Sequence, residues 1–166
     1  LLRQLELAGL DEAGVQIGEL LVGNINDDGY LTQSVEELAA STGFDPARVR
    51  DVLDVIQDFD PVGVGASDLK ECLLLQLERM GQGEGVAAAV VRGHLEDLGR
   101  KRWREIAHAL KVEPEQVQAA ARVIGTLDPK PGRRFTAEVA AYIEPDVVVE
   151  KVDGEYVVIL NEDQLP

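Results

Sequence analysis

Apolar and polar residues alternate along most of this chain with the period of an α-helix. In residues 45–58 the apolar side chains recur at i, i+3, i+4 and i+7, which is typical of a helix that buries one face. Near the end of the chain the period changes, because two valine-rich runs at 147–151 and 156–160 flank Asp153 and Gly154. That dipeptide between two such runs is typical of a β-hairpin turn. The chain is therefore predicted to be mainly α, with a C-terminal β-hairpin.

The helical pattern occurs twice. Residues 35–61 align without a gap on residues 103–129, at a constant offset of 68 positions. Eight of the 27 aligned positions are identical, where chance at an ordinary composition gives about one or two. We therefore predict two helical subdomains with duplicated helix-turn-helix-like units. The identical residues of the first copy are Glu37, Ala39, Pro46, Val49, Val55, Ile56, Asp60 and Pro61.

Each copy is predicted to contain two helices joined by a tight turn. In the first copy Ser34 and Glu37 have the spacing of a capping box, and Gly43 can take the positive φ with which many helices end. Asp45 before Pro46 then starts the second helix, and an acidic residue precedes proline at the same place in the second copy. An aspartate–proline pair stops the second helix of both copies.

Helix-turn-helix units suggest DNA binding, but the charge of the second helices argues against it. A helix that enters the major groove should carry arginine, lysine, asparagine or glutamine. Residues 45–58 hold four aspartates and two arginines, and residues 113–124 hold two glutamates and one arginine. Because attraction to phosphate normally dominates such affinity, the preferred interpretation is a pair of packed helical hairpins, and direct DNA binding is the alternative.

Charge is unevenly distributed along the chain. The formal net charge of −15 consists of −13 in residues 1–99, +5 in residues 100–134 and −7 in residues 135–166. Two interpretations of the basic island at the start of the middle part stay open. It is either a solvated helix start, although cations there oppose the helix dipole, or a contact for an acidic protein surface or a nucleic-acid backbone. The residues of the basic island are Arg100, Lys101, Arg102, Trp103 and Arg104.

Composition excludes several classes of protein. The single cysteine, Cys72, permits no internal disulfide and fits the reducing cytoplasm. No stretch of about 18 apolar residues marks a membrane span, and no signal-peptide pattern is present. The chain starts at Leu1 inside an apolar helical pattern and without a methionine, so we expect a piece of a longer protein.

The residues that could carry chemistry form no convincing site. Residues 24–35 resemble the start of a calcium loop but lack the glutamate at its twelfth position. Residues 63–66 are rich in glycine before a helix but lack the third glycine and the preceding strand of a nucleotide-binding loop. His94 and His108 have no metal-ligand spacing. We therefore expect no cofactor, no metal and no enzymatic activity.

Caps and glycines suggest where the chain divides. Ser67 can cap a helix that runs to Met80, and a further helix is expected over residues 84–97. Glycines at positions 81, 83 and 85 make the joint between these helices flexible. The expected divisions are a first helical subdomain at residues 1–82, a second at 83–135, and a C-terminal extension with the hairpin at 136–166.

Several strings of residues resemble the core-binding domain of bacterial sigma-54 factors. They run in the family's order over essentially the whole chain, and the most specific is Phe-Asp-Pro-Val-Gly-Val-Gly-Ala at residues 59–66. Ser67 departs from the arginine expected at that position, so no side-chain contact is carried over there. The other strings are residues 23–24 with 29–31, 69–73 with 75–77, 129–132 with Phe135, and 142–143 with 145–147.

The resemblance implies a transcription initiation factor that binds core RNA polymerase and directs it to a distinct promoter class. In this family the polymerase–promoter complex stays closed until a distant activator ATPase remodels it. The glutamine-rich region that meets the activator and the C-terminal segments that read the promoter are not in this sequence. The chain would then be a non-catalytic, cytoplasmic docking module. Promoter DNA and the activator would be contacted mainly through other parts of the parent protein.

The polymerase is expected to contact the basic island and the loop after residue 59. Hot spots of binding are usually a few arginine or aromatic anchors, and the loop glycines can matter for shape alone. The alternative function is a helix-turn-helix DNA-binding module that uses the basic residues of 100–134. The candidate partner-binding residues are Arg100, Lys101, Arg102, Arg104, Asp60, Pro61, Gly63 and Gly65.

Overall fold

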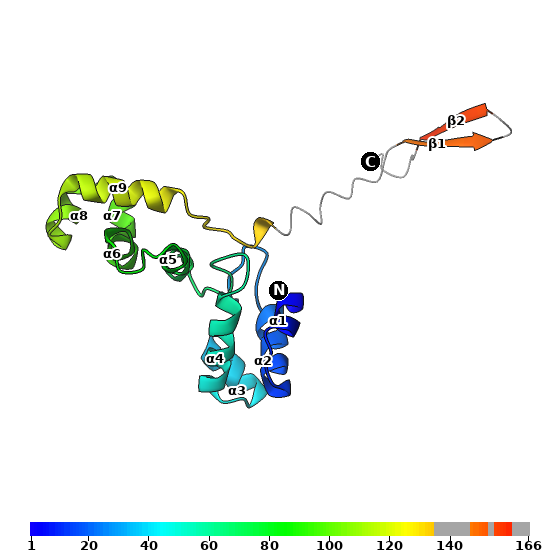
Figure 1. Ribbon diagram of the computed structural model, residues 1–166, viewed down its shortest axis with the longest axis horizontal. Coiled ribbons are helices and arrows are strands. Elements are labelled where there is room, and N and C mark those ends of the chain that lie inside the picture. Colours follow the sequence, from blue (N-terminus) through cyan, green and yellow to red (C-terminus); the bar gives the residue numbers. More distant parts are fainter. Residues whose placement is uncertain (135–146, 153–154, 161–166) are drawn as a thin grey trace. The chain divides into compact units, whose positions relative to one another are not determined.

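The structure, a computed structural model, describes residues 1–134 together with two strands at 147–152 and 155–160. The chain divides into two compact units, Leu1–Arg134 and Phe135–Pro166. The first unit is helical throughout (Figure 1), so the predicted mainly α class is confirmed. Its helices are α1 Leu2–Leu7, α2 Glu12–Gly23, α3 Val35–Thr42, α4 Pro46–Gln57, α5 Leu69–Arg79, α6 Val86–Gly93, α7 Leu95–Gly99, α8 Trp103–Leu110 and α9 Pro114–Gly125.

The second unit contains two paired strands. Strand β1, Val147–Val152, is antiparallel to β2, Glu155–Leu160, with Val147 opposite Leu160. Asp153 and Gly154, on which the hairpin prediction rests, lie outside the described residues. The hairpin turn therefore stays a prediction.

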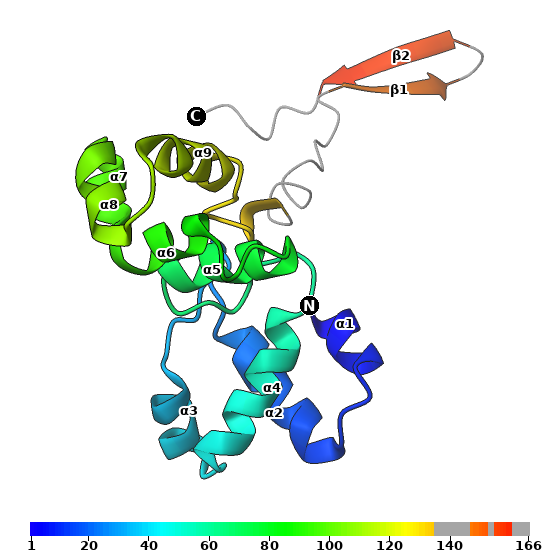
Figure 2. The same cartoon turned by 60° about the vertical axis from the view of Figure 1, so that its left-hand side comes forward.

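The helical unit contains two hydrophobic cores. In the first, α2 packs along α4, and α1 and α3 cover this pair (Figures 1 and 2). In the second, α6 and α8 pack against α9, and α5 covers α6. Side chains almost fully buried in the first core include Leu5, Ile17, Leu21, Leu38, Val49 and Ile56, and those in the second include Leu77, Val90, Val91, Ile106 and Val117.

Helix α5 belongs to the second core, because Leu73 and Leu77 are buried there. The chain therefore passes from the first core to the second in the loop before α5, since Phe59 and Val64 still belong to the first. The glycine-rich joint at residues 81–85 connects two helices that pack together. A division of the chain at residue 82 stays a prediction.

The helix bounds reproduce the offset of the sequence repeat. Residues 35–42 of α3 shifted by 68 give residues 103–110, the bounds of α8, and α4 shifted in the same way gives α9. Gly43 ends α3 with a φ of +78°, and Lys111 ends α8 with a φ of +56°. The turn between the helices thus has the same left-handed geometry in both copies, although the second copy has no glycine there.

The predicted capping box of α3 is confirmed. The backbone N–H of Glu37 donates to Ser34 Oγ at 3.2 Å, and the backbone N–H of Ser34 donates to the Glu37 carboxylate at 2.9 Å. The bond from the Ser34 backbone N–H to the Glu37 carboxylate, and next the interaction of that carboxylate with the Ser34 hydroxyl, lower the pKa of Glu37. Asp45 caps α4 as predicted, because its carboxylate accepts a bond of 3.0 Å from the backbone N–H of Ala47.

Two predictions about helices were wrong. The cap of α5 is Asp68, whose carboxylate accepts from the backbone N–H of Glu71 at 2.9 Å, whereas the Ser67 N–H donates to the Glu71 side chain. The single helix expected at 84–97 is broken at His94 into α6 and α7.

Candidate partner-binding surfaces

The loop that contains four predicted site residues is largely buried. Pro61, Gly63 and Gly65 are buried, and Asp60 is exposed. Gly63 has a φ of +96°, and a Cβ there would lie 2.9 Å from the Cys72 sulfur. Gly65 has a φ of +77°, and its N–H donates to the Gly29 carbonyl at 2.9 Å. The two glycines therefore shape the loop and contribute no side chain to a surface.

A glutamine side chain holds the aspartate of each aspartate–proline pair. Gln4 of α1 accepts a hydrogen bond of 2.9 Å from the Asp60 backbone N–H and donates one of 2.7 Å to the Asp60 carbonyl. Gln76 of α5 makes the same two bonds with Asp128, at 2.8 and 2.7 Å. The first helix of each core thus fixes the segment that follows the last helix of that core.

The segment after α9 is also held by the loop between α2 and α3. Tyr30 donates its hydroxyl to the Pro129 carbonyl at 2.5 Å. The Asp28 carboxylate pairs with Lys130 at 2.9 Å and with Arg133 at 2.6 Å. Hydrogen bonds from Lys130 and Arg133 hold the pKa of Asp28 below its usual range. These polar contacts connect the two cores.

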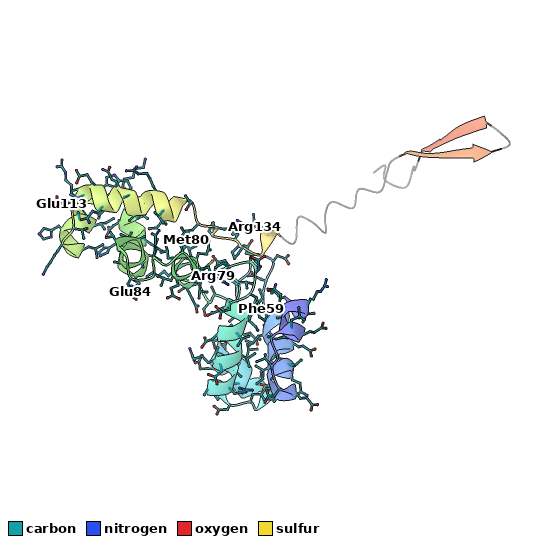
Figure 3. The ribbon with its side chains drawn as sticks, viewed as in Figure 1. Phe59, Arg79, Met80, Glu84, Glu113 and Arg134 are labelled. Carbon is teal, nitrogen blue, oxygen red and sulfur yellow. The ribbon has the colours of Figure 1, made fainter. Side chains whose placement is uncertain are left out.

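A groove of about 360 Å³ is lined by residues from both aspartate–proline segments. Arg79, Met80 and Arg134 lie near one another at its side, as Figure 3 shows. The Arg79 guanidinium donates to the Asp58 carbonyl at 2.6 Å, and Arg134 pairs with Asp128 at 3.0 Å. The groove is lined by Asp60, Pro61, Val62, Gln76, Arg79, Met80, Thr126, Leu127, Asp128, Pro131 and Arg134.

The basic island comprises the link between α7 and α8 and the first two residues of α8, and its cations are not equivalent. Arg100 pairs with Glu96 at 2.6 Å. Arg102 lies between Asp97, at 3.5 Å, and Glu105, at 3.4 Å. Lys101 and Arg104 form no ion pair with any residue of 1–134.

Trp103 lies at the centre of the surface around the basic island. Its side chain is half-buried and packs against the second core. Two hollows meet at this side chain, one of about 360 Å³ formed by residues 101–105, the other of about 520 Å³ extending to α9. The second hollow is lined by Lys101, Trp103, Gln118, Ala121 and Arg122.

The other features that the sequence raised are a metal site, Cys72, the calcium-like segment and a membrane span. Within them no group of three histidine, cysteine, aspartate or glutamate side chains could hold a metal ion. Cys72 is buried, and burial raises the pKa of its thiol. Asn26 of the calcium-like segment accepts hydrogen bonds of 3.0 Å from the backbone N–H groups of Asp28 and Tyr30, so it acts as a turn residue. None of the helices in the described part of the chain has the length and apolar character needed to cross a membrane.

Sequence reasoning missed several of these residues. Gln4 and Gln76 stand 72 positions apart and not 68, so the repeat alignment does not pair them. Arg122 and Gln118 were detectable, because the same alignment sets them opposite Asp54 and Arg50 and reveals a change of charge.

Residues 1–134 thus form a helical module with candidate surfaces for binding a partner. No metal cluster occurs among the described residues. The model of the family described as "Sigma-54 factor, core binding domain" matches residues 1–166. The chain therefore belongs to the sigma-54 factor core-binding domain family.

Curated relatives agree with this family. The chain is 37% identical over 154 residues to an RNA polymerase sigma-54 factor of Acidithiobacillus ferridurans, covering 90% of this chain and 32% of that protein. It is 35% identical to the sigma-54 factor of Salmonella typhimurium and 33% identical to that of Escherichia coli, in both cases over 100% of this chain and 36% of the relative. The chain thus spans about a third of the length of these relatives.

Proposed function

We propose that this chain is the core RNA polymerase-docking module of an enhancer-dependent sigma-54 factor and acts in transcription initiation. The observation that carries the proposal is the family match, which extends over residues 1–166. The acidic chain, without a metal cluster in its described residues, fits a subunit that binds a protein and does no chemistry of its own.

The proposal also includes the repeated units, the C-terminal hairpin, the location and the partners of the parent protein. Residues 35–61 and 103–129 are two copies of one helix-turn-helix-like unit, and the coincidence of their helix bounds supports this. The copies serve as scaffolds for protein contact, and the C-terminal strands form a hairpin around Asp153 and Gly154. The chain is non-catalytic and works in the cytoplasm. The parent protein contacts promoter DNA and the activator ATPase mainly through segments outside this chain.

The experiment that tests the proposal is a binding titration with purified bacterial core RNA polymerase. The 166-residue chain is labelled and titrated with polymerase, and duplex promoter DNA is titrated in parallel. Saturable binding to polymerase without DNA binding is the expected result. DNA binding that weakens steeply with salt, without affinity for polymerase, would overturn the proposal in favour of the helix-turn-helix alternative.

A further inference from the structure

The repeat offset provides an internal reference for the surface around Trp103. A shift of 68 positions pairs Trp103 with Val35 and Arg104 with Glu36. It also pairs Gln118, Ala121 and Arg122 of α9 with three residues of α4. Since the helix bounds agree at the same offset, the two surfaces have corresponding positions on corresponding helices.

In the first copy this surface is closed by the chain itself. Val35 is 6% exposed and belongs to the first core. Glu36 forms an ion pair of 2.7 Å with Arg50, which spans α3 and α4 across the face. Leu53 of α4 is 5% exposed and belongs to the same core.

In the second copy the same positions are open and positively charged. Arg104 replaces Glu36 and Gln118 replaces Arg50, so the ion pair cannot form. Alanine at position 121 replaces the leucine and borders the hollow of about 520 Å³ beside Trp103. With Arg122 in place of Asp54 and Lys101 in place of Gln33, the formal charge of the four polar positions changes from −1 to +3.

These cations are available to a partner. Lys101, Arg104 and Arg122 are exposed and form no ion pair with any residue of 1–134. Trp103 offers the apolar contact between them. Tryptophan and arginine are the residues most enriched in binding hot spots, and like charges close together favour a ligand that neutralises them.

We propose that Lys101, Trp103, Arg104, Gln118 and Arg122, hereafter the Trp103 surface, bind an acidic segment of core RNA polymerase. This inference rests on the proposed function and specifies the chemistry of the contact. Carboxylates of the segment lie against Lys101, Arg104 and Arg122, and an apolar side chain packs on Trp103. The contact distinguishes the second copy of the unit from the first.

An acidic protein segment fits this surface better than a nucleic acid. Duplex DNA carries one negative charge per ~1.7 Å of its axis, so it needs an extended basic face. Here Glu105 lines one of the hollows, Glu113 and Glu115 are exposed at the start of α9, and the whole chain has a net charge of −15. A short segment with a few carboxylates matches three cations around one aromatic ring.

The test converts the second copy into the first. The triple variant Trp103→Val, Arg104→Glu, Gln118→Arg restores the valine and the ion pair of the first copy, and the single variant Arg122→Asp changes one exposed side chain. Arg3→Glu is the control for Arg104→Glu, because it makes the same change of charge at an exposed residue that pairs with no residue of 1–134. Circular dichroism and thermal melting establish that each variant is folded.

The readout is binding of the 166-residue chain to core polymerase, with duplex and single-stranded DNA as parallel probes. We expect the triple variant to weaken polymerase binding by tenfold or more, and Arg122→Asp by several-fold; Arg3→Glu should bind like the unaltered chain. Unaltered binding by both folded variants would overturn the inference and leave the proposed function standing. Loss of DNA binding alone would assign the surface to nucleic acid and overturn it as well. If the unaltered chain itself fails to bind polymerase, the proposed function fails first.

Discussion

Corresponding surfaces of the two cores in the helical unit differ in whether their cations form ion pairs. In the first core, Arg48 pairs with Asp11 at 2.5 Å and Arg50 pairs with Glu36 at 2.7 Å. Around α8 and α9 of the second core, Lys101, Arg104 and Arg122 pair with no residue of 1–134. Both cores nevertheless end in a corresponding pair of helices, α3 and α4 or α8 and α9, followed by an aspartate–proline segment held by a glutamine.

This difference distinguishes the apolar positions, which folding requires, from the charged surface positions, which folding does not constrain. Exposed ion pairs contribute little to stability, on the order of 0–1 kcal/mol each, so the second core loses little stability when Lys101, Arg104 and Arg122 stay unpaired within residues 1–134. The apolar positions are retained more closely: Leu38 corresponds to Ile106, and Val49 to Val117, and all four are buried. A repeated core with a changed surface is what binding, rather than folding, would select.

The largest effect expected from this comparison concerns one pair of identical residues. Ile56 is fully buried in the first core, whereas its counterpart Ile124 is half-buried in the second. Ile56→Ala should therefore lower the free energy of unfolding by about 2–5 kcal/mol because it leaves a cavity, and Ile124→Ala should lower it by less.

Urea denaturation followed by circular dichroism measures both changes. Equal losses for the two variants would mean that the cores are packed alike, contrary to their exposure. Val55→Ala is the control for removal of an apolar side chain from α4 at a half-buried position, where Val55 packs at the edge of the same core.

Which parts of this architecture can be predicted depends on how local their causes are. The bounds of α3 and α4 follow from Ser34, Gly43 and Pro46, whose effects act within one turn of the chain. The offset then carries these bounds to α8 and α9, although Lys111 gives no sign of the positive φ that it adopts. The predicted cap of α5 was wrong because Ser67 and Asp68 are both good capping residues. The Ser67 N–H instead donates a hydrogen bond to the Glu71 side chain.

The candidate site was less predictable, because its causes are distant in the sequence. Composition located the basic island but could not tell that Arg100 and Arg102 are paired whereas Lys101 and Arg104 are not. The Gln4–Asp60 bonds join residues 56 positions apart. No local pattern identifies such a partner, since many exposed glutamines have the same neighbourhood.

The second prediction concerns Gly63, which the sequence marked as a site residue. Gly63→Ala combines a positive φ with a Cβ only 2.9 Å from Cys72 Sγ and Gln76 Nε2. The variant should lose about 2–4 kcal/mol of stability. Gly43→Ala is the matched control, because it has a φ of +78° and no atom within 4 Å of the added Cβ. Thermal melting should show the larger loss for Gly63→Ala; equal losses would mean that the contact with α5 relaxes freely.

The third prediction compares the two glutamines. Gln76 is 9% exposed, and Gln4 is half-buried. Gln76→Ala leaves the Asp128 N–H and carbonyl without their partner in a part-buried place, which should cost about 1–3 kcal/mol. Gln4→Ala should cost less, since water can reach the exposed Asp60 backbone bonds. Hydrogen exchange at the Asp60 and Asp128 amides measures the loss of each glutamine's bond. Faster exchange at Asp60 alone in both variants would contradict the pairing of Gln76 with Asp128.

The smallest expected effect tests how the loop between α2 and α3 holds the segment after α9. Asp28 pairs with Lys130 and Arg133, which lower its pKa in the folded chain. A carboxyl group with a depressed folded pKa stabilises the fold above its unfolded pKa of about 3.9, and that contribution disappears as the pH falls through the folded value. Asp28→Asn should therefore melt slightly lower than the unaltered chain at neutral pH, and the difference should shrink below about pH 4.

Asp27→Asn is the control for this variant, since Asp27 is exposed and pairs with no residue of 1–134. It removes the same charge beside the same loop without touching Lys130 or Arg133. A melting difference that stays constant from neutral pH to acid for Asp28→Asn would show that its carboxylate does not act through these two cations. The contact between this loop and the segment after α9 would then depend on Tyr30, whose hydrogen bond to the Pro129 carbonyl does not change with pH in this range.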